Sequence, residues 1–168
     1  MRRLAPSLLL VVLVAAAPAA AQVLPGTTAR ERGSIRAEFL DAVMHGVRET
    51  STRWMDALHG GDADAAAALY LDDALLVPPS GREVIGADAI RRYMAEAVES
   101  LGGLETFLSD VDASNNMAMT AERFVLPPAS PGDDVMRGTL LTVWLNDGRR
   151  WRIRAQVFRP REDETGGP

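Results

Sequence analysis

The sequence predicts an α+β domain in which helices come first and an antiparallel sheet follows. Residues 34–101 repeat apolar side chains at helical spacing, whereas residues 104–159 alternate apolar and polar side chains as strands do. Two turn sequences, Asn115-Asn116 and Asp147-Gly148, fit tight hairpins between consecutive strands. Elements segregated in this order pack their helices on one face of a curved sheet.

The first part of the chain is expected to form three helices. The first starts at an N-cap, Ser34, and ends at Gly60-Gly61, because a small hydroxyl side chain caps a helix start and glycine ends a helix. The second starts at Asp62 and runs through Tyr70, and the third follows Gly86. The apolar side chains of the first helix recur every four residues: Ile35, Phe39, Val43 and Val47.

Five strands are expected, one among the helices and four after them. The first is a short apolar segment at 75–77, which Pro78-Pro79 ends. The longer strands form a meander joined by the two tight turns and by a wider loop at 127–134. These longer strands cover 104–112, 117–126, 135–146 and 149–159.

Residues 1–21 are expected to be a cleavable signal peptide. A short positive start is followed by the apolar run Leu4–Val14 and then by small residues up to Ala21. Cleavage after Ala21 would place the mature protein in the periplasm or outside the cell, with no membrane contact. The alternative is an uncleaved membrane anchor, for which this apolar run is marginal.

The remaining chain is expected to hold one domain. Residues 22–33 carry Pro, Gly and Thr without periodicity, which indicates a flexible leader. Residues 34–159 form the domain, and residues 160–168 are typical of a polar, disordered tail. A chain of this size buries a single hydrophobic core.

Composition excludes several kinds of site. The 168 residues carry a formal charge of −5, contain no cysteine, and include 18 basic residues, all of them arginine. Lack of cysteine excludes disulfides and thiolate chemistry, and lack of lysine excludes a Schiff base or a phosphate-loop lysine. The acidic balance argues against nucleic acid as a partner. Because no nucleotide-binding motif is present either, we expect no cofactor.

The histidines do not predict a metal site. His45 and His59 stand fourteen residues apart on one expected helix, which places them about 21 Å apart along its axis. His45 and Glu49 have the spacing of an i, i+4 pair, but a third ligand is not evident. His59 suits the C-terminal end of a helix, where positive charge is favourable.

Short motifs spread over residues 40–160 occur in the order and spacing of a known superfamily. They comprise Trp54 with Ala57, Gly61-Asp62, Ala68-Leu69-Tyr70, Asp72-Asp73-Ala74, Pro78-Pro79 with Gly81, Gly86-Ala87-Asp88-Ala89-Ile90, Thr142-Val143-Trp144, Asp147-Gly148 and Trp151-Arg152-Ile153. In these motifs the chain resembles the nuclear-transport-factor-2-like superfamily, and in particular its SnoaL-like branch of small proteins. Each motif alone is weak, and their order together is specific for the fold.

The resemblance implies a cone-shaped, curved antiparallel sheet wrapped around three N-terminal helices, with a pocket at the open end. It does not imply one function, because such proteins include isomerases, cyclases and dehydratases, ligand-binding proteins and proteins that only dimerise. Six side chains are expected to line the pocket of this chain: Trp54, Tyr70, Met119, Trp144, Arg154 and Gln156.

Glu122 and Tyr70 are the candidate catalytic residues. A Glu122 side chain that points into the cone could transfer protons, and one that points outward would pair with an arginine on a neighbouring strand. Tyr70, expected on the second helix, either donates its hydroxyl to a ligand or is a core residue bonded to the backbone. Gln156 occupies a position where related sequences often carry a proton-exchanging side chain, which glutamine is not.

The sequence leaves three functions open. The first is a homodimer, paired through the outer sheet face, that holds a small apolar molecule in its cone. The second is an isomerase, cyclase or dehydratase with Glu122 as acid or base and Tyr70 as oxyanion donor. The third is a dimerising module with a closed cone, which a filled interior and an exposed apolar outer face would favour.

Overall fold

The computed structural model of the chain describes residues 28–128, 130 and 134–161. The expected signal peptide, the first half of the expected leader and most of the expected tail lie outside the described residues. Within the described ranges, no helix combines the length and the apolar character needed to cross a membrane.

The first helix, α1 (Ala29–His59), starts earlier than the sequence predicted. The Thr28 side chain accepts from the backbone N–H of Glu31, and the Glu31 carboxylate accepts from the backbone N–H of Thr28, a reciprocal capping box. The predicted N-cap, Ser34, is therefore wrong. Ser34 lies inside the helix and donates its hydroxyl to Glu38. Residues 29–33, expected in the flexible leader, belong to this helix.

The second helix, α2 (Ala63–Ala67), is shorter than expected, although Asp62 caps it as predicted by accepting from Ala65 N–H. Tyr70 does not lie on this helix. It is the first residue of β1 (Tyr70–Val77), where it pairs with Ile153. The alanine run favours a helix, but pairing with Ile153 near the end of the chain makes the segment from Tyr70 onward a strand. The third helix, α3 (Ala87–Leu101), follows Gly86 as predicted.

The predicted meander is confirmed to within a few residues of each boundary. It consists of β3 (Glu105–Ser114), β4 (Met117–Leu126), β5 (Met136–Asn146) and β6 (Trp151–Pro160). Asn115 and Gly148 have positive φ angles of 56° and 90°, as the two tight turns require.

One six-stranded sheet results, in the order β2-β1-β6-β5-β4-β3. Strands β3 to β6 pair antiparallel with one another, as predicted, and β1 pairs with β6 in parallel, which is the one parallel pairing of the described sheet. A parallel partner is possible because α3 and the meander lie between these strands in the chain. The short β2 (Val84–Ile85) was not expected, and it extends the edge beside β1.

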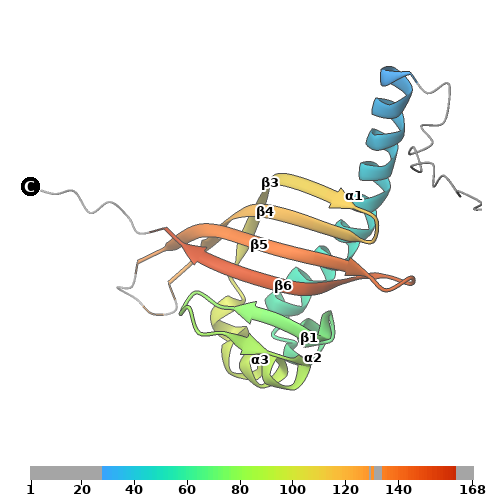
Figure 1. Cartoon of the computed structure of the whole chain (residues 1–168). Coiled ribbons are helices and arrows are strands. Elements are labelled where there is room, and N and C mark those ends of the chain that lie inside the picture. The colour runs from blue at the N-terminus through green and yellow to red at the C-terminus, as the bar shows by residue number, and fades with distance from the viewer. Residues whose placement is uncertain (1–27, 129, 131–133, 162–168) are drawn as a thin grey trace, which may run out of the picture.

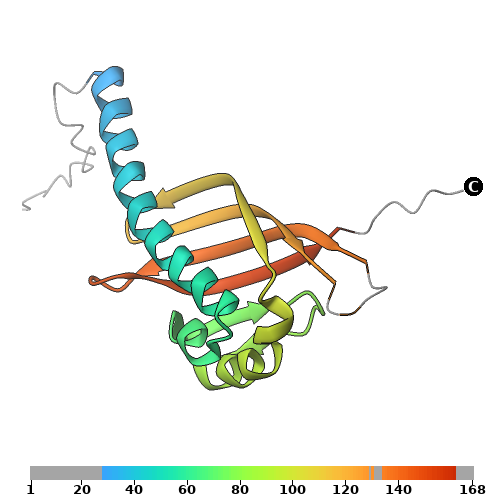
Figure 2. The same cartoon turned by 180° about the vertical axis from the view of Figure 1, so that it is seen from behind.

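The helices cover one face of the sheet, as an α+β fold of this kind requires. Helix α1 crosses that face diagonally, and α2 and α3 lie beside β1 (Figures 1 and 2). The core fills the space between them, where Leu58, Ile90 and Met94 are fully buried. Gly46 gives the Trp151 indole room against α1, since a Cβ at Gly46 would stand 2.5 Å from a ring carbon. We call the covered face the inner face and the opposite one the outer face.

The close packing at Gly138 of β5 leads to a stability prediction. A Cβ at Gly138 would stand 2.6 Å from a Phe124 ring carbon and 2.8 Å from Pro160 Cα. We expect Gly138→Ala to lower the free energy of unfolding by about 2 kcal/mol or more, because backbone cannot yield as a flexible side chain can. Chemical denaturation measures this. The matched control, Gly33→Ala, fills open space in a helix and should raise stability by about 0.5 kcal/mol. Equal effects of the two changes would contradict the packing.

Candidate functional site

A row of polar side chains crosses the inner face of the sheet. Thr120 on β4, Thr142 on β5 and Gln156 on β6 stand directly opposite one another in register. All three are buried. Since buried polar groups need partners, this row must be satisfied from within the protein.

Hydrogen bonds extend this row at both ends. At one end the Tyr70 hydroxyl donates to Gln156 Oε1, and Gln156 Nε2 donates to Thr142 Oγ1 over 3.4 Å. At the other end Trp144 Nε1 donates to Thr120 Oγ1 over 3.0 Å, and the Thr120 hydroxyl donates to Glu122 Oε1 over 3.1 Å. The carboxyl group of Glu122 therefore ends a chain of oriented dipoles.

A β-bulge in β6 determines which of its side chains join the polar row on the inner face. Trp144 pairs with Ile153 and Val143 pairs with Ala155, so Arg154 is the extra residue and has no partner on β5. Strict alternation places Ile153 and Gln156 on opposite faces. With one residue inserted between them, both face inward.

The sequence placed Gln156 and Arg154 together in the expected pocket. Because of the bulge, the two side chains do not lie on the same face. Arg154 lies near the surface, where its guanidinium donates to the Asp73 carbonyl over 2.6 Å and lies 3.4 Å from the Asp73 carboxylate. It contributes nothing to the polar row. No glycine or proline marks the bulge in the sequence.

The structure brings four of the six expected pocket side chains into the interior. Each of them is 2% exposed or less: Trp54, Tyr70, Trp144 and Gln156. Met119 is 44% exposed and lies on the outer face of β4, opposite Val143, so its assignment to the pocket is wrong. Alternation in β4 puts Met119 on the face away from Glu122.

Glu122 points inward, which decides between the two alternatives for this side chain. It is 7% exposed and shares the inner face with Thr120 and Phe124. None of the ion pairs between described residues includes Glu122, so it is not the cross-strand partner of an arginine.

The two candidate catalytic residues are not brought together. Glu122 lies on β4 and Tyr70 on β1, with β5 and β6 between them in the sheet. The Tyr70 hydroxyl is engaged by Gln156. An oxyanion donor must have its proton free for the substrate, so Tyr70 and Glu122 do not form a catalytic pair in this arrangement.

Burial raises the pKa of the Tyr70 hydroxyl far above its ordinary value of 10.0. The Trp54 indole lowers this pKa slightly and the neighbouring Tyr93 raises it further. Trp54 Nε1 itself makes no hydrogen bond to a described residue. Tyr70 is thus a neutral hydrogen-bond donor throughout the physiological range.

His59 makes a structural contact, and His45 is exposed. His59 lies in the last turn of α1, with Nε2 3.0 Å from the carbonyl oxygen of Leu104, and so ties the helix end to the start of the meander. In the described part of the chain, His, Cys, Asp and Glu side chains form no group of three or more that could hold a metal ion.

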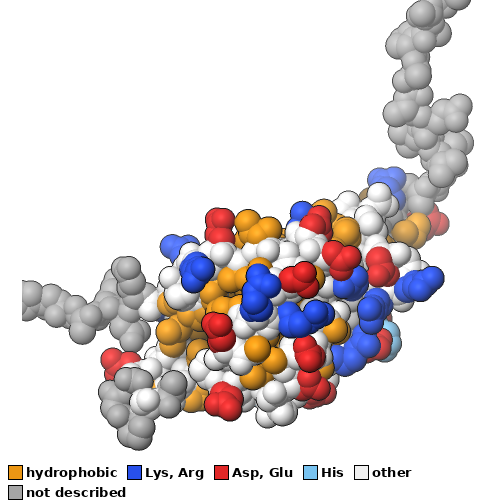
Figure 3. All heavy atoms as spheres, turned by 90° about the horizontal axis from the view of Figure 1, so that it is seen from below, with side chains coloured by type: hydrophobic (Ala, Val, Ile, Leu, Met, Phe, Trp, Pro, Cys, Tyr) orange, Lys and Arg blue, Asp and Glu red, His pale blue; other side chains and the backbone are white. Residues whose placement is uncertain are grey.

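Surface hollows lie away from the expected cone pocket. Two lie beside α3 and have volumes of about 410 and 620 Å³. The first is lined by charges of both signs, including Arg82, Arg92, Glu83 and Glu96. Figure 3 views the side on which α3 lies and shows acidic and basic side chains intermixed there. Further hollows lie near Gly138, where β5 begins and β4 and β6 end.

Sequence comparison identifies the family. A SnoaL-like domain matches residues 51–153, and the chain belongs to the SnoaL-like domain family. Comparison with curated proteins gives no match.

Solved structures confirm the fold. A ketosteroid isomerase-like protein from Erwinia carotovora atroseptica superposes with a TM-score of 0.60 at 15% identity, over 71% of this chain and 96% of that one. An NTF-2 like protein of unknown function from Shewanella oneidensis gives 0.59 at 21% identity, over 68% and 97%. A domain of unknown function with a cystatin-like fold from Nostoc punctiforme gives 0.56 at 18% identity, over 82% of each chain. At these identities the likeness establishes the fold alone.

Burial of the Tyr70 hydroxyl predicts a loss of stability at alkaline pH. Its folded pKa lies above the unfolded value near 10, so the unfolded chain releases this proton first. The free energy of unfolding should therefore be unaffected below pH 10 and fall by about 1.4 kcal/mol per pH unit above it. Chemical denaturation between pH 8 and pH 11.5, about the accessible range, measures the slope.

The same measurement on two variants assigns that slope. Tyr70→Phe should lose most of it, whereas Tyr93→Phe should keep most of it, because Tyr93 is only half-buried and makes no side-chain hydrogen bond to a described residue. A slope that survives Tyr70→Phe unchanged would contradict the buried position of this hydroxyl.

Proposed function

We propose that the protein is an exported SnoaL-like domain that works as a homodimer, paired through one half of its outer sheet face. The observation that carries this proposal is an apolar surface, here called the apolar half, made by two rows of side chains in register across β4, β5, β6 and β1. The rows are Met119–Val143–Ala155–Leu75 and Ala121–Leu141–Val157–Val77.

The apolar half is unusual for a surface. Met119 and Leu141 are exposed and the other members are half-buried, and no described helix covers this face (Figure 1). Contiguous apolar surface of this kind marks an association site on soluble proteins. A two-fold dimer places the same patch of both copies against each other, so one patch is sufficient.

Burial of the expected pocket side chains supports the same proposal. Four side chains expected to line a ligand pocket are instead buried in the core, where Tyr70 bonds Gln156 and Trp144 bonds Thr120. The first function left open by the sequence needs that space for an apolar molecule. We therefore favour the dimerising module over the ligand carrier.

Export rests on the sequence of residues 1–21, which has the charge, apolar run and small residues of a signal peptide. We propose cleavage after Ala21 and a periplasmic or extracellular location. Mass spectrometry of the intact protein recovered from its host tests this, with a mature N-terminus at Gln22 expected.

Dimerisation is tested by replacing Leu141 with aspartate. Native mass spectrometry and sedimentation should show the mature wild-type protein as a dimer with no small molecule attached. Leu141→Asp should weaken the dimer about a hundredfold or more, because it buries a charge in an apolar contact. Ile35→Asp, at an exposed apolar position on α1, is the matched control and should leave the dimer intact. A wild-type monomer at micromolar concentration would refute the proposal.

A second candidate function is acid–base chemistry at Glu122. The observation that favours it is the inward, buried carboxyl group, which receives a hydrogen bond from Thr120 and has no basic partner among the described residues. Burying a carboxyl group without a cation is costly, and such costs are tolerated mostly where function requires them. The ketosteroid isomerase-like protein of similar fold supports a reaction of this class without identifying it.

If Glu122 is kept for acid–base chemistry, its buried carboxyl group should lower the free energy of unfolding of the protein. Glu122→Gln keeps an acceptor for the Thr120 hydroxyl and removes the carboxyl group, so the free energy of unfolding at pH 7 should rise by about 1 kcal/mol or more. Glu105→Gln, at an exposed position on β3, should change it by less than about 0.5 kcal/mol. Thermal or chemical denaturation measures both. A loss of stability in Glu122→Gln would show that the carboxyl group is a structural acceptor instead.

A further inference from the structure

The outer sheet face has a second half that differs sharply from the apolar half. In the next two rows along the strands, Arg123 stands opposite Thr139, which stands opposite Arg159, and Val125 stands opposite Arg137. Arg161, just beyond β6, donates its backbone N–H to the Arg137 carbonyl and continues the second row. Four arginines therefore lie on one end of one face, which we call the basic half.

These arginines lack the acidic partners that five other arginines of the described chain have. Arg36, Arg53, Arg91, Arg152 and Arg154 each form an ion pair with an aspartate or glutamate. The four side chains of the basic half form no ion pair and no side-chain hydrogen bond with any described residue. One carboxylate, Glu105 on β3, lies on the same face opposite Val125, and it too is absent from the ion pairs of the described residues.

The basic half carries positive charge that no described carboxylate neutralises by an ion pair. Arg123 and Arg159 are separated by two strand spacings, about 9.6 Å, a little beyond the Debye length of about 8 Å, so salt screens most of their mutual repulsion at physiological ionic strength. In a protein of net charge −5, four clustered and unpaired guanidinium groups form a local positive potential that an anion would neutralise.

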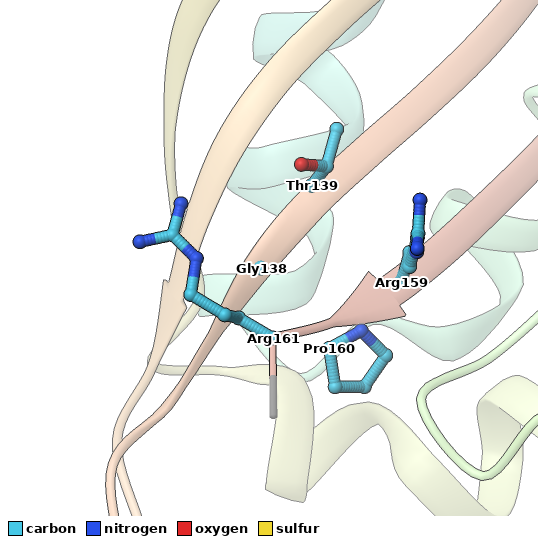
Figure 4. Close-up of a pocket in the computed structure, with 5 residues that line it drawn as sticks. All are labelled: Gly138, Thr139, Arg159, Pro160 and Arg161. Atoms are coloured by element: carbon cyan, nitrogen blue, oxygen red, sulfur yellow. The ribbon is translucent and has the colours of Figure 1, made fainter. Parts of the chain in front are cut away.

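Two adjoining hollows shape this surface. One, of about 310 Å³, is lined by Arg123, Arg137 and Arg161 together with apolar side chains of Phe107, Phe124 and Val125. The other, of about 440 Å³, is lined by Gly138, Thr139, Arg159, Pro160 and Arg161. Gly138 and Arg161 belong to both. Figure 4 shows the guanidinium groups of Arg159 and Arg161 extending in different directions from the end of β6, with Thr139 on the adjacent strand.

We propose that the basic half binds a small organic anion with an apolar body, such as an aromatic or acyl carboxylate. The guanidinium groups of Arg123, Arg137 and Arg161 would hold its charged group, since arginine matches the planar geometry of a carboxylate. Phe107, half exposed, and Val125 would contact its apolar body. This site is separate from the apolar half, so it does not depend on the proposed dimer.

Calorimetric titration of the full-length mature protein with 2-naphthoate tests the proposal, with the neutral 2-naphthamide as the matched probe. We expect 2-naphthoate to bind, with 2-naphthamide about tenfold weaker or more. The double variant Arg123→Gln/Arg137→Gln should lose about tenfold or more of the affinity for 2-naphthoate and little of that for 2-naphthamide. Its folding is checked by an unchanged circular dichroism spectrum.

The control variant removes two positive charges elsewhere. Arg149→Gln/Arg150→Gln, at the exposed β5–β6 turn, should leave the affinity for 2-naphthoate unchanged, and an equal loss in the two double variants would overturn the site. The acidic residues Glu162, Asp163 and Glu164 follow Arg161 in the chain and could compete. A full-length protein with all three changed to glutamine is therefore titrated as well. Failure of 2-naphthoate to bind either protein at millimolar concentration would also overturn the proposal.

Discussion

The pairing of β5 with β6, with its one extra residue at Arg154, is the constraint on which the interior of the protein depends. Without that bulge, Ile153 and Gln156 could not both face inward. Gln156 would then be exposed, Thr142 would lose its donor, and the buried Tyr70 hydroxyl would lack an acceptor. An unsatisfied buried hydroxyl is expensive, so the bulge and the polar row stabilise each other.

The same sheet explains why the two faces suggest different roles. On the inner face, aromatic and polar side chains are buried under the helices, and Glu122 is the one buried carboxyl group of the described core. On the outer face, strand register sorts side chains along the strands into an apolar half and a basic half. The dimer and the anion site that we propose would use different rows of the same strands.

Local features of the fold could be predicted well. The strand 117–126 and the tight turns follow from alternation and from residues that accept positive φ, both of which are properties of a few neighbouring residues. The start of α1 was missed although Thr28 and Glu31 have the spacing of a capping box, a signal present in the sequence. Tyr70 was misplaced because its strand exists only through pairing with Ile153, far along the chain. Thr142 could be placed opposite Gln156 only with the bulge known.

The sequence by itself determined the order of helices and strands, the family, and the set of side chains on each face of β4, because periodicity and turn chemistry act over short distances. Only the tertiary structure decided that Glu122 faces inward, that Met119 and Arg154 do not join Gln156, and that four arginines gather on one end of the sheet. Those outcomes depend on register between strands and on which face the helices cover. Both are set by contacts between segments distant in the chain, which leave no mark in a local pattern.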